Sequence, residues 1–437
     1  WEWTQAAMGV SLHRVVMSTL DGPTAATIDP VGRDDAPYPE DLWRELDALQ
    51  EATGARFLSI PHNSNRSRGY MFGEKTIRGE VITADFARTR LGWEPVIEVT
   101  QFKGDSETHP ALSPDDEFAD FERFEFNVQR PPQHWNYVAS VGDYARSALR
   151  RGLEMEERLG VNPYQFGMIG STDSHTSIPS SEEPNFWGKI AVDSIPENKR
   201  RENADGIVSG INSFNGWNMS ASGIAAVWAT ENTREAIFEA FKRKEVYATT
   251  GPRIALRVFG GWSFDEAATG ADDIADIGYA AGVPMGGDLS NPPANGDAVQ
   301  LLIRATRDPK SANLDRVQVI KGWLDDSGNT HEHIFDVAWS DDRRPDTAGK
   351  LPAVGNTVDL MTGRHTDDIG ATEFSVLWSD PTFDPGQSAF YYVRVLQIPT
   401  VRHSQLDAIA LGQDTPYEGP ATIQERAYSS PIWFKPS

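Results

Sequence analysis

The sequence predicts an α/β fold: a parallel sheet closed into a distorted, TIM-like βα barrel, followed by an antiparallel β-sandwich. Helical and strand patterns alternate as far as Thr250, and polar residues follow several of the strands, which together predict the barrel. After Gly251, apolar strands are separated by Asp, Gly, Asn and Pro turns with no helical pattern between them, which predicts the sandwich. We expect residues 1–252 to form the barrel, 253–403 the sandwich, and 404–437 an irregular tail that packs back on both.

The predicted barrel elements follow one another as strands and helices. Residues 1–20 contain two short strand patterns. A helix is predicted over residues 39–53, because Pro39 suits a first helical turn and leucines recur on one face before Gly54. A run of buried-strand type follows and ends at Pro61. The later predicted elements are a helix over 83–90, a strand over 95–100, a helix over 142–159, a strand from 166, a strand over 223–229 and a helix over 232–244.

Composition limits the classes of partner and of chemistry. The 40 Lys and Arg residues against 64 Asp and Glu give a net charge of −24, which repels nucleic acid and anionic membranes, so we expect no nucleic-acid partner. No segment reaches the apolar length of a membrane span. Because the chain has no cysteine, thiolate metal ligands, cysteine nucleophiles and disulfides are excluded.

The clearest candidate for chemistry is the stretch Phe-Gly-Met-Ile-Gly-Ser-Thr-Asp-Ser-His-Thr over residues 166–176. A short apolar strand ends there in a polar loop that carries Asp173 and His175. A carboxylate and an imidazole two residues apart can bind one ion, and this donor pair suits Zn, Mn or Fe. The alternative is an ordinary loop at a helix start in which Asp173 is a cap.

Further ionisable residues lie at or near predicted strand ends, namely Glu2, His13, His62 and Glu98. Because the strand ends of a barrel converge on one mouth, we expect these side chains to meet there. We expect Glu98 to be a hydrogen-bond acceptor beside the metal ligands. Two alternatives stay open: Glu2 as a surface acid, and His13 as a core histidine that bonds its own partner.

These motifs resemble those of a known superfamily. Glu2, His13, Pro61-His62-Asn63 and Ser171-Thr-Asp173-Ser-His175 resemble the later motifs of the polymerase and histidinol phosphatase (PHP) superfamily, and more closely a bacterial PHP-like branch with an appended β domain. The resemblance implies a PHP-type barrel with two or three divalent transition-metal ions (Zn, Mn or Fe) and a bridging hydroxide that attacks phosphorus. It implies Glu2 as bridging ligand, His13 and His62 as single-metal ligands, and Asp173 and His175 as a closing pair, with Glu2, His62 and Asp173 catalytic.

The pattern departs from the superfamily at its beginning. The earlier His-x-His and Thr-Asp-His motifs are not found before Glu2, and the chain opens at Trp1 without an initiator Met. We therefore expect an N-terminally incomplete barrel whose preceding segment, including a targeting signal, lies outside this chain. The resemblance implies a periplasmic or secreted protein.

The resulting functional prediction is a metal-dependent hydrolase, a phosphoesterase in the first place, with a small-molecule or polymer ester as substrate. Residues next to the ligands, namely Arg14, Asn63, Arg66 and Lys103, are the candidates for binding its anionic group. The alternative is a non-catalytic glycan- or protein-binding protein on a degenerate barrel. A metal-dependent lyase or amidohydrolase-like enzyme would share the site.

Overall fold

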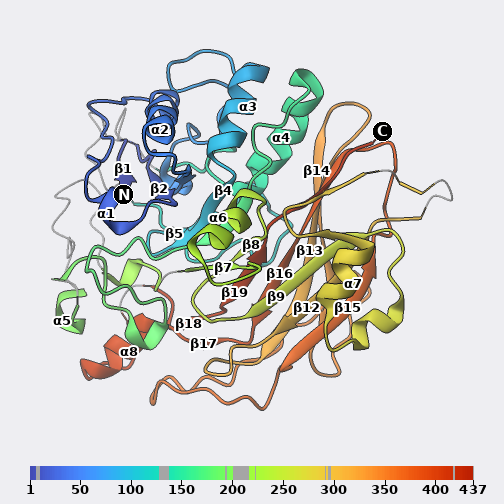
Figure 1. Cartoon of the computed structure of the whole chain (residues 1–437). Coiled ribbons are helices and arrows are strands. Elements are labelled where there is room, and N and C mark those ends of the chain that lie inside the picture. Colours follow the sequence, from blue (N-terminus) through green and yellow to red (C-terminus); the bar gives the residue numbers. More distant parts are fainter. Residues whose placement is uncertain are drawn as a thin grey trace.

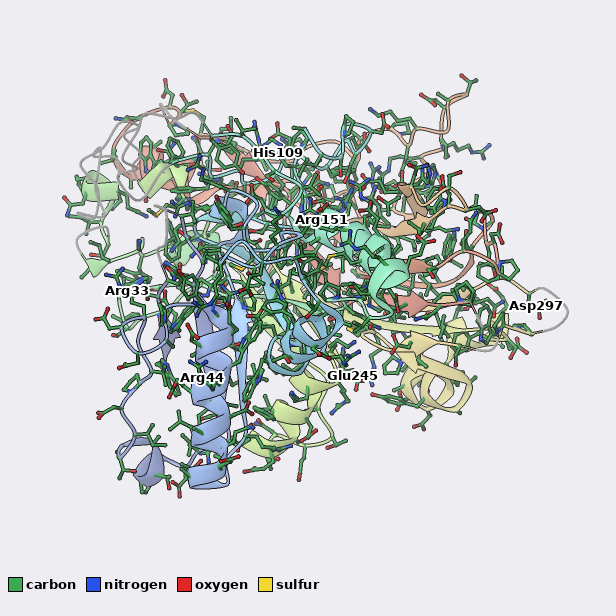
Figure 2. The ribbon with its side chains drawn as sticks, turned by 90° about the horizontal axis from the view of Figure 1, so that it is seen from above. Arg33, Arg44, His109, Arg151, Glu245 and Asp297 are labelled. Atoms are coloured by element: carbon green, nitrogen blue, oxygen red, sulfur yellow. The ribbon has the colours of Figure 1, made fainter. Side chains whose placement is uncertain are left out.

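The computed structural model describes residues 1–436 apart from residues 6–9, 127–136, 192–193, 200–215, 222, 291, 294–296 and 417–418. Helices α2, α3 and α4 lie together in the upper part of Figure 1, and the long strands β12 to β16 lie in the right half, with β14 reaching the upper part. Figure 2, a view from above, shows Arg44 of α2 and Asp297 on opposite sides of the molecule. The helix-rich and strand-rich parts therefore lie side by side.

The N-terminal part contains a three-stranded antiparallel sheet formed by β1 (Glu2–Trp3), β2 (Arg14–Ser18) and β3 (Phe57–Pro61), in the order β1-β2-β3. Helix α2 (Pro39–Thr53) packs on it through an apolar cluster that includes Trp3, Leu42 and Leu46. The helix begins with Pro39, has two acidic residues in its first turn and ends at Gly54, whose φ of 70° lies in the left-handed region.

A second small sheet lies next to the first along the chain. Strands β4 (Val96–Gln101) and β6 (Gly167–Gly170) pair in parallel, and β5 (Gly104–Asp105) pairs antiparallel with β4. Apolar residues of helices α3 (Ala84–Trp93) and α4 (Ala145–Leu159) pack with those of β4 and β6. Helix α3 also contacts β3, and α4 contacts β13 and β14 of the C-terminal part. Apolar residues of α4, β4, β6 and the C-terminal strands share one core cluster.

The strand-rich part consists of two sheets packed face to face. The smaller contains β10 (Gly282–Pro284), β9 (Ala255–Gly261), β12 (Gln300–Thr306) and β15 (Glu373–Ser379). The larger contains β13 (Leu314–Leu324), β14 (Thr330–Trp339), β16 (Ala389–Gln397), β19 (Arg426–Ser429), β20 (Ile432–Phe434), β11 (Asp288–Leu289), β8 (Val246–Thr249) and β7 (Ile224–Val227). Val258 and Ile303 of the smaller sheet share an apolar core with Val319 and Val393 of the larger.

Short elements complete the described chain. They are α1 (Gly22–Ala25), α5 (Pro196–Lys199), α6 (Arg234–Lys242), α7 (Ile274–Ala281), α8 (His403–Ala410), β17 (Thr400–Val401), β18 (Thr422–Ile423) and the 3-10 turns η2 (Ser64–Arg66), η3 (Glu183–Asn185), η5 (Gly216–Asn218) and η6 (Glu266–Gly270). In the described part of the chain, no helix has both the length and the apolar character to cross a membrane.

The predicted TIM-like, PHP-type barrel is wrong, because the described residues form several separate sheets and no closed barrel. Strand β2 pairs antiparallel with both β1 and β3, and β7 pairs antiparallel with β8. The parallel pairs among the described residues are β4 with β6 and β11 with β20. Buried apolar runs indicate that a strand is covered on both faces, but they do not fix the direction of its neighbours.

Two further expectations for the C-terminal part are also corrected. Helix α7 lies between β9 and β10, where no helix was expected, and its Gly278 allows close packing on Phe259. The tail after residue 403 is not irregular: β19 pairs with both β16 and β8, inside the large sheet. The large sheet thus connects β7 and β8 with the strands of the C-terminal part.

Candidate metal centre

The first three strands bring Glu2, His13 and His62 together. Glu2 lies on β1, His13 directly precedes β2, and His62 directly follows β3, so the antiparallel order β1-β2-β3 places them at one end of the sheet. The backbone N–H of His62 donates to the carbonyl oxygen of His13 at 3.2 Å. Glu2 Oε1 is 2.7 Å from His13 Nδ1 and 3.7 Å from His62 Nε2. The two imidazole centroids are 5.5 Å apart and their planes are nearly perpendicular, at 85°.

The loop after β6 adds Asp173 and His175 to the same carboxylate. Ligand atoms of Glu2, Asp173 and His175 lie within 4.8 Å of one another, as do those of Glu2, His13 and His62. Glu2 therefore belongs to two triads. Asp173 has a φ of 52°, a conformation that Asp adopts more readily than most residues, and His175 Nδ1 is 3.0 Å from the Asp173 carbonyl oxygen. The carboxylate of Asp173 is almost buried, whereas His175 is half-exposed.

Local electrostatics keep the two carboxylates ionised. Burial opposes ionisation of Glu2, but its interactions with His13 and His62 hold the pKa of Glu2 below its ordinary value. Burial likewise opposes ionisation of Asp173, and the ammonium group of Lys103 beside it lowers the Asp173 pKa to about 2. Both side chains are thus anionic near neutral pH.

Three neighbouring groups, His13, His62 and Glu98, differ in how readily they bind a proton. Burial lowers the pKa of His13 to about 4, so that its imidazole is neutral near pH 7. Burial also disfavours a charge on His62, but the carboxylates of Glu2, Glu98 and Asp173 outweigh it and raise the His62 pKa. Burial raises the pKa of Glu98 to about 7, although Gln101 Nε2 donates to its Oε1 at 2.8 Å.

Buried polar atoms without a hydrogen-bond partner gather around this centre. In the described part of the chain they include His13 Nε2, both ring nitrogens of His62 and both amide atoms of Asn63. The separation of 3.7 Å between His62 Nε2 and Glu2 is too long for a hydrogen bond. Because buried polar groups are normally paired, such atoms indicate a place where a bound group belongs. Two carboxylates and three imidazoles fit a divalent transition-metal ion.

The four residues predicted to bind an anion are placed differently. Lys103 contacts Asp173, and Asn63 directly follows His62 with a φ of 59°. Arg66 Nε donates to the Phe126 carbonyl oxygen at 3.3 Å, and its guanidinium is 5.5 Å from the Phe124 ring centroid. Arg14 is buried, with Nε 2.9 Å from Glu94 Oε1. Lys103 and Asn63 are therefore at the centre, whereas Arg14 is engaged with Glu94.

Sequence reasoning named Lys103 but missed Phe102 and Lys189. The Phe102 ring centroid is 6.5 Å from that of His175, and the ammonium groups of Lys103 and Lys189 are 4.9 and 5.8 Å from the Phe102 centroid. The signal for Phe102 was its position immediately after β4, a buried strand that pairs with β6. His109, on the loop after β5, is buried, with Nε2 3.0 Å from Glu125 Oε1.

Comparison with known proteins finds one family that matches nearly the whole chain. No curated protein matches the sequence. The family described as "Protein of unknown function (DUF3604)" matches residues 1–436. The match covers both small N-terminal sheets and all of the strand-rich part. The chain therefore belongs to the DUF3604 family.

Proposed function

We propose that the protein is a metal-dependent hydrolase that acts on phosphate esters or closely related esters. Glu2, His13, His62, Asp173 and His175 would hold two or three divalent transition-metal ions (Zn, Mn or Fe). The observation that carries the proposal is that two triads of ligand atoms share Glu2, while the buried imidazole nitrogens of His62 lack hydrogen-bond partners within the described part of the chain.

The chain's own residues supply binding and proton transfer. Ions bound here would provide Lewis-acid activation of water and of the ester oxygens. The Glu2 carboxylate, ionised and common to both triads, keeps the ligand sets adjacent. Glu98 is buried beside His62 and Asp173, and its pKa of about 7 lets it hold or release a proton near neutral pH. Glu98 is thus our candidate for proton transfer to a leaving group.

The substrate class follows from charge at the centre. The chain as a whole carries a net charge of −24, which repels anions from most of its surface. At the centre, however, the ammonium groups of Lys103 and Lys189 lie on the ring of Phe102 next to His175. Together with bound metal ions, these ammonium groups would favour an anionic ester, and Phe102 offers an apolar surface to the part of the substrate that is not charged.

The test is hydrolysis of p-nitrophenyl phosphate and bis-p-nitrophenyl phosphate after incubation with Zn or Mn. The proposal predicts turnover of at least one of them, with loss of about a hundredfold or more in His62→Ala and in Asp173→Asn. His331→Ala is the matched control, because His331 is a half-exposed histidine that also has a carboxylate partner, Asp325 at 2.7 Å. Equal turnover in wild type, His62→Ala and Asp173→Asn would overturn the proposal.

A further inference from the structure

A second cavity lies away from the metal centre. It has a volume of about 330 Å³ and lies among η3, the loop after β12, β17, α8 and the segment between β18 and β19. In Figure 1, α8, β17 and β18 lie at the lower left, whereas β1 and β2 lie at the upper left. Pro184 and Lys310 at its rim are exposed, and Glu183 and Glu425 in its wall are buried. The cavity is therefore open to solvent and has a buried acidic floor.

The floor contains a carboxylate oxygen without a partner. One oxygen of Glu183 accepts a hydrogen bond from the His403 backbone N–H at the start of α8, while Oε1, fully buried, has no partner among the described residues. Glu183 is 8% exposed as a residue and lines the cavity. The hydrogen bond at the start of α8 accounts for one carboxylate oxygen of Glu183. A polar ligand in the cavity would supply a hydrogen-bond partner for the other oxygen.

Glu425 is a second buried carboxyl group beside the first. Its Oε2 accepts from the Thr250 hydroxyl, and it is 2% exposed. Burial raises the pKa of Glu183 to about 7, and burial together with repulsion from Glu183 raises the Glu425 pKa well above its ordinary value. Both carboxyl groups therefore hold a proton more readily than usual, and a bound cation beside them would favour their ionised forms.

The protein's own cations near the floor are already engaged. Arg402 makes two contacts of 2.8 Å with the carboxylate of Glu122 and also donates to the carbonyl oxygens of Trp217 and Met219. Lys199 is 2.9 Å from Asp407 Oδ2. Arg402 also attracts Glu183 and Glu425, but Oε1 of Glu183 still has no hydrogen-bond partner among the described residues.

The rest of the wall combines apolar and polar residues. Pro184, Pro252, Val401 and Leu406 form its apolar part, and Lys310, Ser311, His365 and Thr400 also line the cavity. The apolar part suits a short carbon chain, which a hydrated inorganic cation lacks. We propose that this cavity binds a small organic ammonium compound, with the amine beside Glu183 and Glu425 and the carbon chain against Pro252, Val401 and Leu406. The proposal is independent of the metal centre.

Isothermal titration calorimetry of the full chain tests this proposal with n-butylamine and 1,4-diaminobutane, and with 1-butanol as the neutral analogue. We expect saturable binding of one amine per chain, at least about tenfold tighter than that of 1-butanol. Glu425→Gln keeps the shape of the floor and removes the carboxyl group that would ionise beside a bound amine, so it should weaken amine binding by about tenfold or more. The absence of saturable binding by both amines in wild type, or equal affinity for amine and alcohol, would overturn the proposal.

Matched variants separate binding from folding. Glu182→Gln removes a carboxylate at the rim that is paired with Arg253, at 3.0 Å, and should change amine affinity by less than about twofold. Leu406→Trp narrows the cavity from its apolar wall and should abolish amine binding without touching a charge. Wild-type affinity in both Glu425→Gln and Leu406→Trp would show that the amine binds elsewhere and would contradict the assignment.

Discussion

Lys103 holds its ammonium group against the carboxylate of Asp173, although the two residues are 70 positions apart in the sequence. Both side chains are nearly buried, at 5% and 9% exposure. The contact joins the residue that follows β4 to the loop that follows β6, and these strands are parallel neighbours. Because a metal ion bound by Asp173 would share that carboxylate with Lys103, the two cations compete for one ligand.

Replacing Lys103 should therefore separate metal binding from catalysis. In Lys103→Met we expect severalfold tighter binding of Zn or Mn, because a positive charge next to the ligands is removed. We expect a severalfold higher KM for an anionic ester, because an attractive charge is lost. Metal titration and steady-state kinetics on the same preparation measure both effects. A fall in metal affinity together with an unchanged KM would contradict this role for Lys103.

Asn63 offers a test in which stability and function change in opposite directions. Its φ of 59° is unfavourable for most residues but not for glycine, and neither of its buried amide atoms has a hydrogen-bond partner. Asn63→Gly should keep or slightly raise the free energy of unfolding, while Asn63→Ala should lower it by about 1 kcal/mol. Both variants should reduce ester turnover, measured beside urea unfolding. Full activity in a well-folded Asn63→Gly protein would exclude Asn63 from the site.

Metal affinity should depend on pH through His62. Its pKa is raised by the surrounding carboxylates, so a falling pH adds a proton to the imidazole that must be neutral to bind a metal ion. The pKa values of Glu2 and Asp173 lie well below this range, so these residues stay ionised. The apparent affinity should fall by up to about tenfold per pH unit between pH 8 and 6. Affinity that stays constant over this range would argue against His62 as a ligand.

Asp116 stabilises the contact between α4 and the large sheet. Its carboxylate is buried, 2.8 Å from Arg146 Nη2 and 2.8 Å from Arg394 Nη2. Burial opposes its charge, but Arg394 and Arg146 outweigh burial and lower the Asp116 pKa. Asp116→Asn leaves two buried guanidinium groups under-compensated, so the free energy of unfolding at pH 7 should fall by about 3–5 kcal/mol.

The lowered pKa of Asp116 also determines how the loss of stability in Asp116→Asn depends on pH. A carboxyl group with a lowered folded-state pKa stabilises the fold above its unfolded pKa of about 4, and this stability is lost as the pH falls below that value. The difference between wild type and Asp116→Asn in urea unfolding should therefore be larger at pH 7 than at pH 3. Asp120→Asn, an exposed carboxylate paired with Arg123, is the control and should change stability by about 0.5 kcal/mol or less. A difference that grows towards pH 3 would contradict this prediction.

Sequence patterns predicted individual elements better than their arrangement. Pro39 and Gly54 indicated both ends of α2, and the apolar run before Pro61 indicated β3, because these signals are local. The barrel was wrong because strand direction is set by tertiary pairing, as in the antiparallel pairing of β2 with β3. The insertion of β19 between β16 and β8 brings together segments far apart in sequence, which no local pattern indicates.

The predicted strand ends indicated which candidate ligands would lie close together, although the predicted barrel was wrong. Glu2, His13 and His62 meet because β1, β2 and β3 are neighbours in one sheet, whatever the direction of the strands. Residue identity did not reveal that Arg14 is engaged by Glu94, because a partner 80 positions away cannot be inferred from adjacency. For the same reason Phe102 and Lys189, which meet through tertiary packing, were not found.

The central claim is that Glu2 and the four side chains around it bind transition-metal ions, and the most direct test is metal content. The full chain should be incubated with Zn or Mn, freed of unbound metal by gel filtration and analysed by inductively coupled plasma mass spectrometry. The proposal predicts about two ions per chain in wild type and in His331→Ala, and a loss of most of this metal in the double variant His62→Ala with Asp173→Asn. Wild-type protein without stoichiometric metal, or a double variant that retains the wild-type content, would contradict it.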